Sequence, residues 1–264
     1  MFEKFYFDIL SLKTEMQFRN YSISTQDIYC KTVKEFLETT GKEVIDITRS
    51  DIIRFLDERL KTVHVNTILV MLNALEFFFK EILGIDVADN IRKYKRQFKT
   101  KDFLSEEQLN ILTSSIPSRE RLFCNVIIET GMMVEEVIEL KITDLLLTDD
   151  VWTLGGYEIS KDLATDITDY TERNYLQGYI FTLSNGEDHI LNNTARHWLR
   201  TYTKDVLGKV YTFNDIRHSV ALEMIKKGYE KEATAYLRNK SVNSVRQFYR
   251  RAGYDYYYLN KKQE

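Results

Sequence analysis

Apolar residues recur every three or four positions through the first third of the chain, as they do in amphipathic helices. The run that contains Leu72, Leu75 and Phe79 is apolar over a face too broad for a lone surface helix, so it must be packed. Gly41 is expected to end one helix and Thr48 to cap the next. The pattern predicts a compact bundle of four helices, at roughly 2–19, 24–39, 49–60 and 64–83.

The rest of the chain combines further helices with one short β pattern. Ser105 opens a capping box, and residues 119–130 are apolar on most faces and so belong in a core. Residues 151–168 are rich in β-branched and aromatic types, with turn signals at Gly155–Gly156 and near Lys161–Asp162. This stretch predicts a small three-stranded antiparallel sheet.

Asparagine and glycine mark the boundaries of the later helices. Asn192 or Asn193 is expected to cap one helix, and Asn214 to cap another that ends at Gly228. The fold class expected is mainly α, with a helical bundle followed by an α-rich domain that holds one small antiparallel β-sheet. The expected organisation is a helical domain at 1–88, a basic linker at 89–102 and the second domain at 103–264.

Composition supports a well-filled, helix-dominated fold. Of the 264 residues 44% are apolar and 13% aromatic, and a single proline with ten glycines leaves little irregular structure. No apolar run approaches the roughly 18 residues that cross a bilayer, so we expect a cytoplasmic protein with no membrane partner.

Cys30 and Cys124 are expected to be free thiols. His189 and His197 lack ligand-like spacing, so neither a metal nor a cofactor is expected.

The net charge of −3, taken alone, argues against a nucleic-acid partner, but the distribution of charge along the chain favours one. Residues 91–101 hold six basic side chains and no acidic one, and residues 205–264 hold 12 basic and 7 acidic side chains. A local basic stripe suffices for phosphate binding, because each neutralised phosphate releases counterions. We interpret the linker as a strap along a DNA backbone, with a plain solvated linker as the alternative. Its basic residues are Arg92, Lys93, Lys95, Arg96, Lys99 and Lys101.

Residues 211–251 carry more polar groups than a plain core requires, and Arg217 is the most informative of them. It falls near the first turn of a predicted helix, where backbone N–H groups favour anions and a guanidinium adds a bidentate contact to phosphate. The alternative is an ordinary helix ion pair with Asp215 or Glu223.

The sequence NDIRH at 214–218 is followed by LRN at 237–239 and by an aromatic pair at 248–249. Upstream, residues 127–145 read IIETGMMVEEVIELKITDL. Together these segments resemble the tyrosine recombinases, also called phage integrases, in their Thr-Gly-x-Arg-x-x-Glu, His-x-x-Arg, Leu-Gly-His and Tyr motifs. The resemblance covers residues 102–251. It implies a SAM-like core-binding domain before a catalytic domain, double-stranded DNA as partner, and strand cleavage through a 3′-phosphotyrosine without metal.

Most positions that match the family's catalytic residues carry other side chains here. Met133 stands at the first arginine, Asn214 at the first histidine and Asn239 at the second histidine. Arg217 matches the second arginine, and Glu136 matches a glutamate that supports the site. Methionine has no hydrogen to donate, and the asparagine amides can donate but carry no charge.

The family's nucleophilic tyrosine falls on Phe248, and Tyr249 follows one position later. On a helix that offset rotates the side chain by about 100°. The resemblance also makes Lys161 a candidate for protonating the leaving oxygen, unless it is merely an exposed lysine at a turn. The candidate catalytic residues are Arg217, Tyr249, Lys161, Asn214 and Asn239.

Three functions are compatible with these observations. The preferred hypothesis is a degenerate recombinase that binds DNA as an accessory or regulator. The second is an active recombinase that uses Tyr249, and the third is a helical interaction protein without DNA binding. The bundle at 1–88 either holds DNA or serves packing and oligomerisation, and the tyrosine-rich tail at 252–264 docks on a neighbouring protomer or on its own domain.

Overall fold

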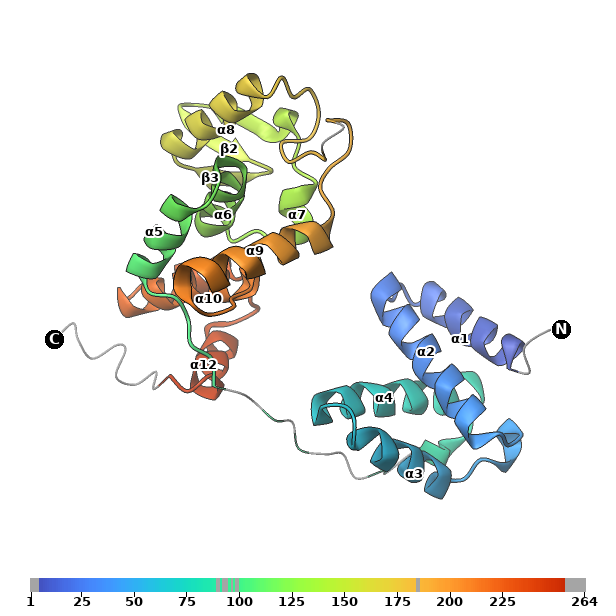
Figure 1. Cartoon of the computed structure of the whole chain (residues 1–264). Coiled ribbons are helices and arrows are strands. Elements are labelled where there is room, and N and C mark those ends of the chain that lie inside the picture. Colours follow the sequence, from blue (N-terminus) through green and yellow to red (C-terminus); the bar gives the residue numbers. More distant parts are fainter. Residues whose placement is uncertain are drawn as a thin grey trace. The chain divides into compact units, whose positions relative to one another are not determined.

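The computed structural model describes residues 5–88, 91, 95, 97, 100–183 and 186–254. The chain divides into two compact units, Met1–Phe98 and Lys99–Glu264 (Figure 1). Each unit has its own apolar core and is described by itself. Within the described ranges, no helix is long and apolar enough to cross a membrane.

The first unit is the helical bundle that the apolar pattern predicts. Its core includes Phe36, which lies edge-on to Phe55 and Phe79 with ring centroids 5.2 and 6.0 Å away. The predicted fourth helix is one α-helix continued by a π-helical turn. The elements are α1 (Tyr6–Phe18), α2 (Ile23–Thr40), α3 (Arg49–Leu60), α4 (Val65–Phe77), the π-helix Phe78–Ile82, and 3₁₀ turns at Val44–Asp46 and Asp86–Ala88.

The predicted helix end at Gly41 and the predicted helix cap at Thr48 are confirmed. Gly41 ends α2 with a left-handed φ of 66°. Thr48 and Asp51 form a capping box at the start of α3, and Lys42 Nζ lies 2.7 Å from the Asp51 carboxylate. The hydrogen bonds from Lys42 and Thr48 hold the pKa of Asp51 far below its usual range.

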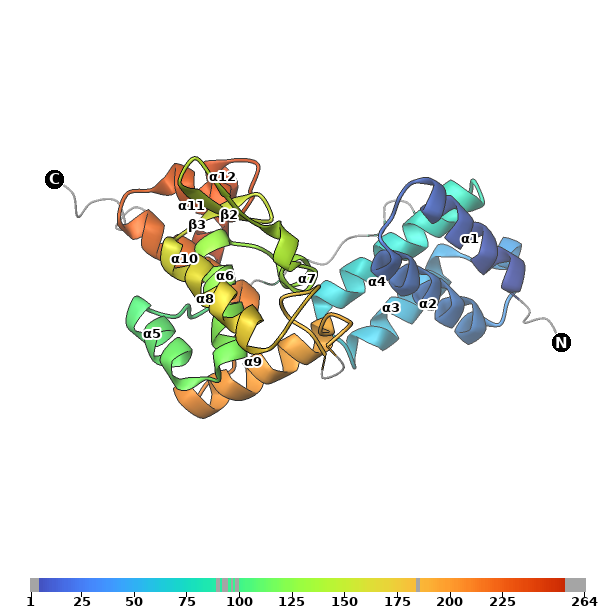
Figure 2. The ribbon, with the colours of Figure 1, turned by 90° about the horizontal axis from the view of Figure 1, so that it is seen from above.

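The second unit combines a small antiparallel sheet with helices (Figure 2). The strands form a meander in the order β1-β2-β3, with Leu145 opposite Leu154 and Trp152 opposite Ile159. The elements are α5 (Glu106–Ser115), α6 (Ser118–Thr130), α7 (Val134–Ile138), the 3₁₀ turn Ile142–Asp144, β1 (Leu145–Thr148), β2 (Val151–Leu154), β3 (Tyr157–Ile159), α8 (Lys161–Arg173), α9 (Asn192–Leu207), α10 (Phe213–Lys226), α11 (Glu230–Tyr236) and α12 (Val242–Arg251).

Helix α6 is central to this unit, as its apolar sequence predicts. It contacts α5, α7, α8, α10 and β3. Phe123 on α6 is fully buried, and the rings of Phe181, Trp198 and Phe213 lie 4.8 to 5.5 Å from it. These rings come from the segment before α9, from α9 and from α10, so α6 packs against all three of these later segments.

The expectation that the β pattern extends to residue 168 is wrong. The sheet ends at Ile159, and Ser160 caps α8 by accepting a hydrogen bond from the Leu163 N–H at 3.1 Å. Leu163 and Ile167 are buried at helical spacing, so their periodicity outweighs the β propensity of the region. Lys161 is therefore the first residue of a helix and does not lie at a turn.

Two predicted helix caps are also wrong by one or two residues. Helix α10 is capped by Thr212, whose Oγ1 accepts from the Asp215 N–H at 3.2 Å while Asp215 accepts from the Thr212 N–H at 2.9 Å. Asn214 lies inside the helix. Asn192 is the first residue of α9, and its amide donates to Glu135.

We predict that Gly131→Ala lowers the free energy of unfolding of the second unit by about 3 kcal/mol or more. Gly131 ends α6 with a φ of 65°, and a Cβ there would lie 2.4 Å from the Tyr236 carbonyl oxygen. Gly208 has a similar φ of 70° with nothing within 4 Å, so Gly208→Ala should cost only about 1 kcal/mol. Urea denaturation of both variants measures the difference, and equal losses would contradict the close approach.

Candidate active site

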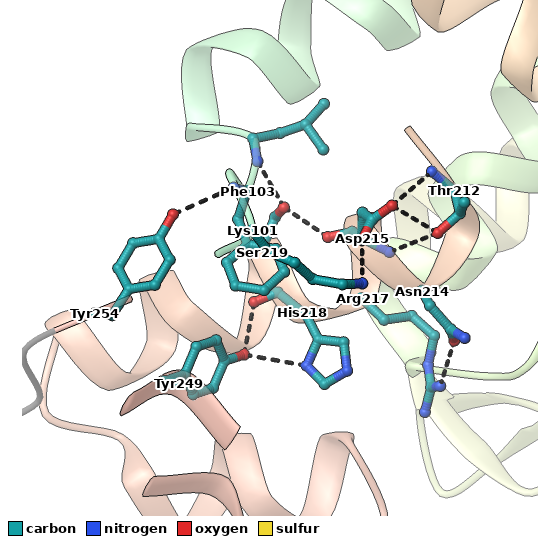
Figure 3. Close-up of polar contacts among 11 residues, drawn as sticks. Lys101, Phe103, Thr212, Asn214, Asp215, Arg217, His218, Ser219, Tyr249 and Tyr254 are labelled. Carbon is teal, nitrogen blue, oxygen red and sulfur yellow. Dashed lines mark hydrogen bonds and ion pairs between the residues drawn. The ribbon is translucent and has the colours of Figure 1, made fainter. Parts of the chain in front are cut away.

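Arg217 on α10 is a buried cation in the second unit, with 5% of its surface exposed. Its Nε donates to the Gly131 carbonyl oxygen at 2.8 Å, and its Nη1 donates to Asn214 Oδ1 at 3.3 Å (Figure 3). Its Nη2 is buried and has no hydrogen-bond partner in the described part of the chain. Burial lowers the pKa of Arg217, and arginine still keeps its charge.

The ion-pair interpretation of Arg217 is wrong. Asp215 instead accepts from Lys101 Nζ at 2.9 Å, and Glu223 pairs with Lys226 at 2.6 Å. The contacts of Arg217 are to a neutral carbonyl and a neutral amide, so its charge is held without a directly bonded carboxylate. Burial of a charge without such a partner costs free energy unless another group compensates it.

Met133 and Glu136 flank the same end of α6. Met133 is 44% exposed and offers a thioether, and its backbone N–H donates to Glu136 Oε2 at 2.7 Å. The other carboxylate oxygen of Glu136 accepts from Arg238 Nη1. Burial raises the pKa of Glu136, but the hydrogen bonds from Arg238 and Met133 outweigh it, so the pKa is lowered and the carboxylate is ionised.

Arg238 is a site residue that the sequence reasoning missed. It follows α11 with a left-handed φ of 55°, and its Cζ lies 4.7 Å from the centroid of the Tyr157 ring on β3. The signal was present, because this arginine stands at the glycine of the Leu-Gly-His motif. A bulky residue at a left-handed position indicates that its side chain has a use.

The other polar candidates do not join this cluster through side-chain contacts. Asn239 is exposed, and its backbone N–H donates to the Thr234 carbonyl at 3.0 Å. Lys161 is exposed at the start of α8, and among the described residues no hydrogen bond or ion pair connects its side chain to Arg217. Of the asparagine and lysine candidates, the structure brings Asn214 alone into contact with Arg217.

Tyr249 on α12 lies in the core. Its side chain is fully buried, and its hydroxyl donates to the His218 carbonyl oxygen at 2.7 Å and lies 3.4 Å from His218 Nδ1 (Figure 3). Its ring lies edge-on to Phe103 at 5.6 Å. Phe248 stacks on the imidazole of His218 with centroids 4.0 Å apart and planes inclined by 15°. Both aromatic residues of this pair are therefore engaged in packing.

His218 is held neutral by its surroundings. Burial, helped by the charges of Lys101 and Arg217 and opposed by Asp215, lowers its pKa to about 4. Burial also acts to raise the pKa of Asp215, but its hydrogen bonds from Lys101 and Thr212 outweigh that effect, and the pKa is lowered. Lys101 thus connects the start of the second unit to α10.

The linker and tail candidates are described in part. Lys95 is exposed, and Lys101 pairs with Asp215, whereas Arg92, Lys93, Arg96 and Lys99 lie outside the described residues. At the other end, the Lys101 N–H donates to the Ala252 carbonyl at 3.1 Å, and Tyr254 stacks on Phe103 with centroids 5.4 Å apart. The first residues of the tail thus pack on their own unit, and residues 255–264 lie outside the described residues.

Comparison with known proteins identifies both halves of the chain. Residues 9–89 match the family described as "Phage integrase, N-terminal SAM-like domain", and residues 102–255 match the "Phage integrase family". The chain is 27% identical to tyrosine recombinase XerA of Pyrococcus furiosus over 253 residues, which cover 90% of this chain and 87% of the relative. It is 25% identical over 232 residues to a tyrosine recombinase of Thermosipho africanus, with 80% and 82% covered.

Solved structures share the fold at low sequence identity. XerH recombinase bound to a palindromic difH substrate has a TM-score of 0.72 at 17% identity, covering 98% of this chain and 86% of that one. A lambda integrase dimer bound to a COC′ core site has a TM-score of 0.71 at 16% identity, covering 95% and 96%. These likenesses confirm the predicted fold class, a helical domain followed by an α-rich domain with a small antiparallel sheet.

We predict that His218 makes stability depend on pH between about 4 and 6.5. Because its pKa is lowered to about 4 on folding, the unfolded chain binds more protons in this window, so stability rises with pH. Acidification from pH 7 to pH 4 should remove up to about 3 kcal/mol through this residue. Urea denaturation of wild type and His218→Phe, which keeps a ring against Phe248, should show a smaller pH dependence in the variant. Parallel profiles would contradict the assignment.

Proposed function

The chain belongs to the phage integrase family of tyrosine recombinases, and on that premise we propose that it binds double-stranded DNA without cleaving it. Its role would be that of an accessory or regulator of recombination or integration. The observation that carries this proposal is the combination of a buried arginine with incomplete charge neutralisation and a tyrosine whose hydroxyl is committed to the core.

DNA binding is supported by charge and by the family. The solved XerH and lambda integrase structures are bound to DNA, and this chain shares their fold. Residues 91–101 hold six basic side chains and no acidic one. We propose that residues 1–88 form the core-binding domain, 89–102 a strap along the phosphates and 103–264 a catalytic-type domain.

The loss of cleavage is supported by the site. Met133 offers no N–H donor at the position of the family's first arginine, and removing one preorganised donor typically costs a factor of about 10²–10³ in rate. Phe248 stands at the nucleophile's position and cannot attack. Tyr249 could attack only after its hydroxyl left the His218 carbonyl and its ring left the core.

One observation favours the second candidate, an active recombinase that uses Tyr249. The Tyr249 hydroxyl lies 3.4 Å from His218 Nδ1, a neutral imidazole nitrogen within reach of its proton, although the pKa of about 4 makes His218 a weak base. Unwinding of the end of α12 would then have to carry Tyr249 toward Arg217. Lys161, Asn214 and Asn239 would be the remaining polar groups available to such a reaction.

We further propose that residues 255–264 contact a neighbouring copy of the chain or a related recombinase. The tail is rich in tyrosine, and apolar surface of this kind needs a partner. Residues 252–254 are already used within their own unit. Deleting 255–264 should therefore reduce self-association on DNA, measured by analytical ultracentrifugation, without unfolding the second unit.

We predict that reversing Arg92, Lys93, Lys95 and Arg96 to glutamate abolishes DNA binding at low salt. The proposed contacts are to phosphate, so wild-type affinity should also fall steeply as salt rises. The probe is a duplex enriched from a randomised pool by capture on the wild-type protein, with affinity measured by fluorescence anisotropy. As a control for net charge, Lys13, Lys31, Arg54 and Lys61, all exposed in the first unit, are reversed together. Equal affinity of the linker variant and this control would contradict the proposed strap, and a failure of wild type to enrich any duplex would favour the interaction protein without DNA binding.

We predict that wild-type protein forms no covalent adduct with DNA. Nicked versions of the enriched duplex are incubated with wild type, with Tyr249→Phe and with the triple variant Met133→Arg, Asn214→His, Phe248→Tyr. Denaturing gels should show no adduct for the first two proteins, because the position of the nucleophile holds a phenylalanine. A wild-type adduct that disappears in Tyr249→Phe would establish the active recombinase instead.

A further inference from the structure

Two guanidinium groups lie beside the end of α6, and both carry buried donors without partners among the described residues. Arg217 Nη2, Arg238 Nε and Arg238 Nη2 make no hydrogen bond to any described residue. The charge of Arg238 acts on Arg217, and the Glu136 carboxylate interacts with both groups. Buried donors without partners are uncommon in native proteins and call for an explanation.

The charges of this cluster do not balance among the residues that the structure describes. Glu136 is the carboxylate that bonds to Arg238, and it faces two guanidinium groups. The neighbouring carboxylate of Glu135 is already shared by the Asn192 amide and by Arg196, whose Nη2 lies 2.7 Å away. An excess positive charge therefore remains beside three unused N–H bearing atoms, which is the arrangement that an oxyanion satisfies.

The backbone at Arg238 gives an independent reason to look for a use of its side chain. The Arg238 N–H donates to the Ala235 carbonyl and the Asn239 N–H to the Thr234 carbonyl, which is the hydrogen-bonding pattern of a Schellman helix end. Glycine suits this left-handed position, and arginine is strained there at a φ of 55°. In this backbone conformation the guanidinium lies over the Tyr157 ring and donates a hydrogen bond to Glu136.

We propose that Arg238 and Arg217 together bind one phosphate group, and that Arg238 supplies the second guanidinium where Met133 offers none. The proposal rests on the proposed function in naming a DNA backbone as the source of that phosphate. Both guanidinium groups donate to acceptors that solvent reaches, the exposed Asn214 for Arg217 and the partly exposed Glu136 for Arg238. An arriving phosphate replaces these acceptors and takes up the unused donors, so it needs only side-chain rotation.

The first test uses inorganic phosphate and Arg238→Gly. Glycine removes the guanidinium and relieves the strained backbone, so loss of binding cannot be attributed to a damaged helix end. Thermal unfolding is followed in rising phosphate at constant ionic strength. Wild type should show a phosphate-dependent rise in Tm, and Arg238→Gly should require at least about tenfold more phosphate for the same rise.

Two variants control for the general stabilising effect of phosphate and for strain relief. Arg173→Gln removes an exposed arginine that pairs with Asp169, and Tyr175→Gly relieves a left-handed φ of 54° at a residue that is 90% exposed. Both should keep the wild-type response to phosphate. A response of Arg238→Gly equal to that of these controls would overturn the proposal.

The second test uses the enriched DNA duplex, and it separates this proposal from the proposed function. Arg238→Gly should weaken DNA binding by about tenfold to a hundredfold and reduce the slope of log affinity against log salt by about one. If wild type binds DNA and Arg238→Gly binds equally well, the two-arginine site is wrong and DNA binding stands. If wild type binds no DNA but binds phosphate through Arg238, the site stands and the DNA proposal falls.

Discussion

The second unit depends on how the C-terminal end of α6 is satisfied. The last carbonyl groups of a helix have no partner within it and carry partial negative charge. Here the Ile127 carbonyl accepts from the Gly131 N–H at 2.9 Å and from the Tyr236 hydroxyl at 2.8 Å, and the Gly131 carbonyl accepts from Arg217 at 2.8 Å. These bonds attach α10 and α11 to the central helix. They also place Arg217 beside the C-terminal end of α6, the end at which Glu136 bonds to Arg238.

This arrangement explains why a charge can be buried here at all. A guanidinium loses hydration on burial, and the partial charges of helix carbonyls replace part of that hydration. The replacement is incomplete, because Arg217 Nη2 has no partner among the described residues. A cluster built for stability alone could use apolar side chains of similar volume, which are often as stabilising as a buried charge or more so. The proposed binding of an anion gives the arginine a role that apolar packing could not fill.

Local signals in the sequence predicted most of the fold. The cap at Thr48, the capping box at Ser105 and the glycine stop at Gly41 are short-range features, and they decide helix ends without help from distant residues. The start of α8 was missed because β-branched residues in 151–168 suggested strand, while burial by neighbouring helices favoured the helical period. Tertiary packing, which no short window of sequence contains, decided that segment.

The site was predictable where it follows motif spacing and unpredictable where it depends on side-chain direction. Arg217 could be found because its place in NDIRH fixes it on the helix face that meets α6. The surroundings of Tyr249 could not be predicted from the sequence. They depend on how α12 packs against α10 and on contact with Phe103, almost 150 residues earlier in the chain. Phosphate binding needs positive charge and donors, whereas cleavage also needs a free nucleophile. The structure places two arginines beside α6 and the Tyr249 hydroxyl against the His218 carbonyl, so the proposed phosphate binding does not depend on a free tyrosine.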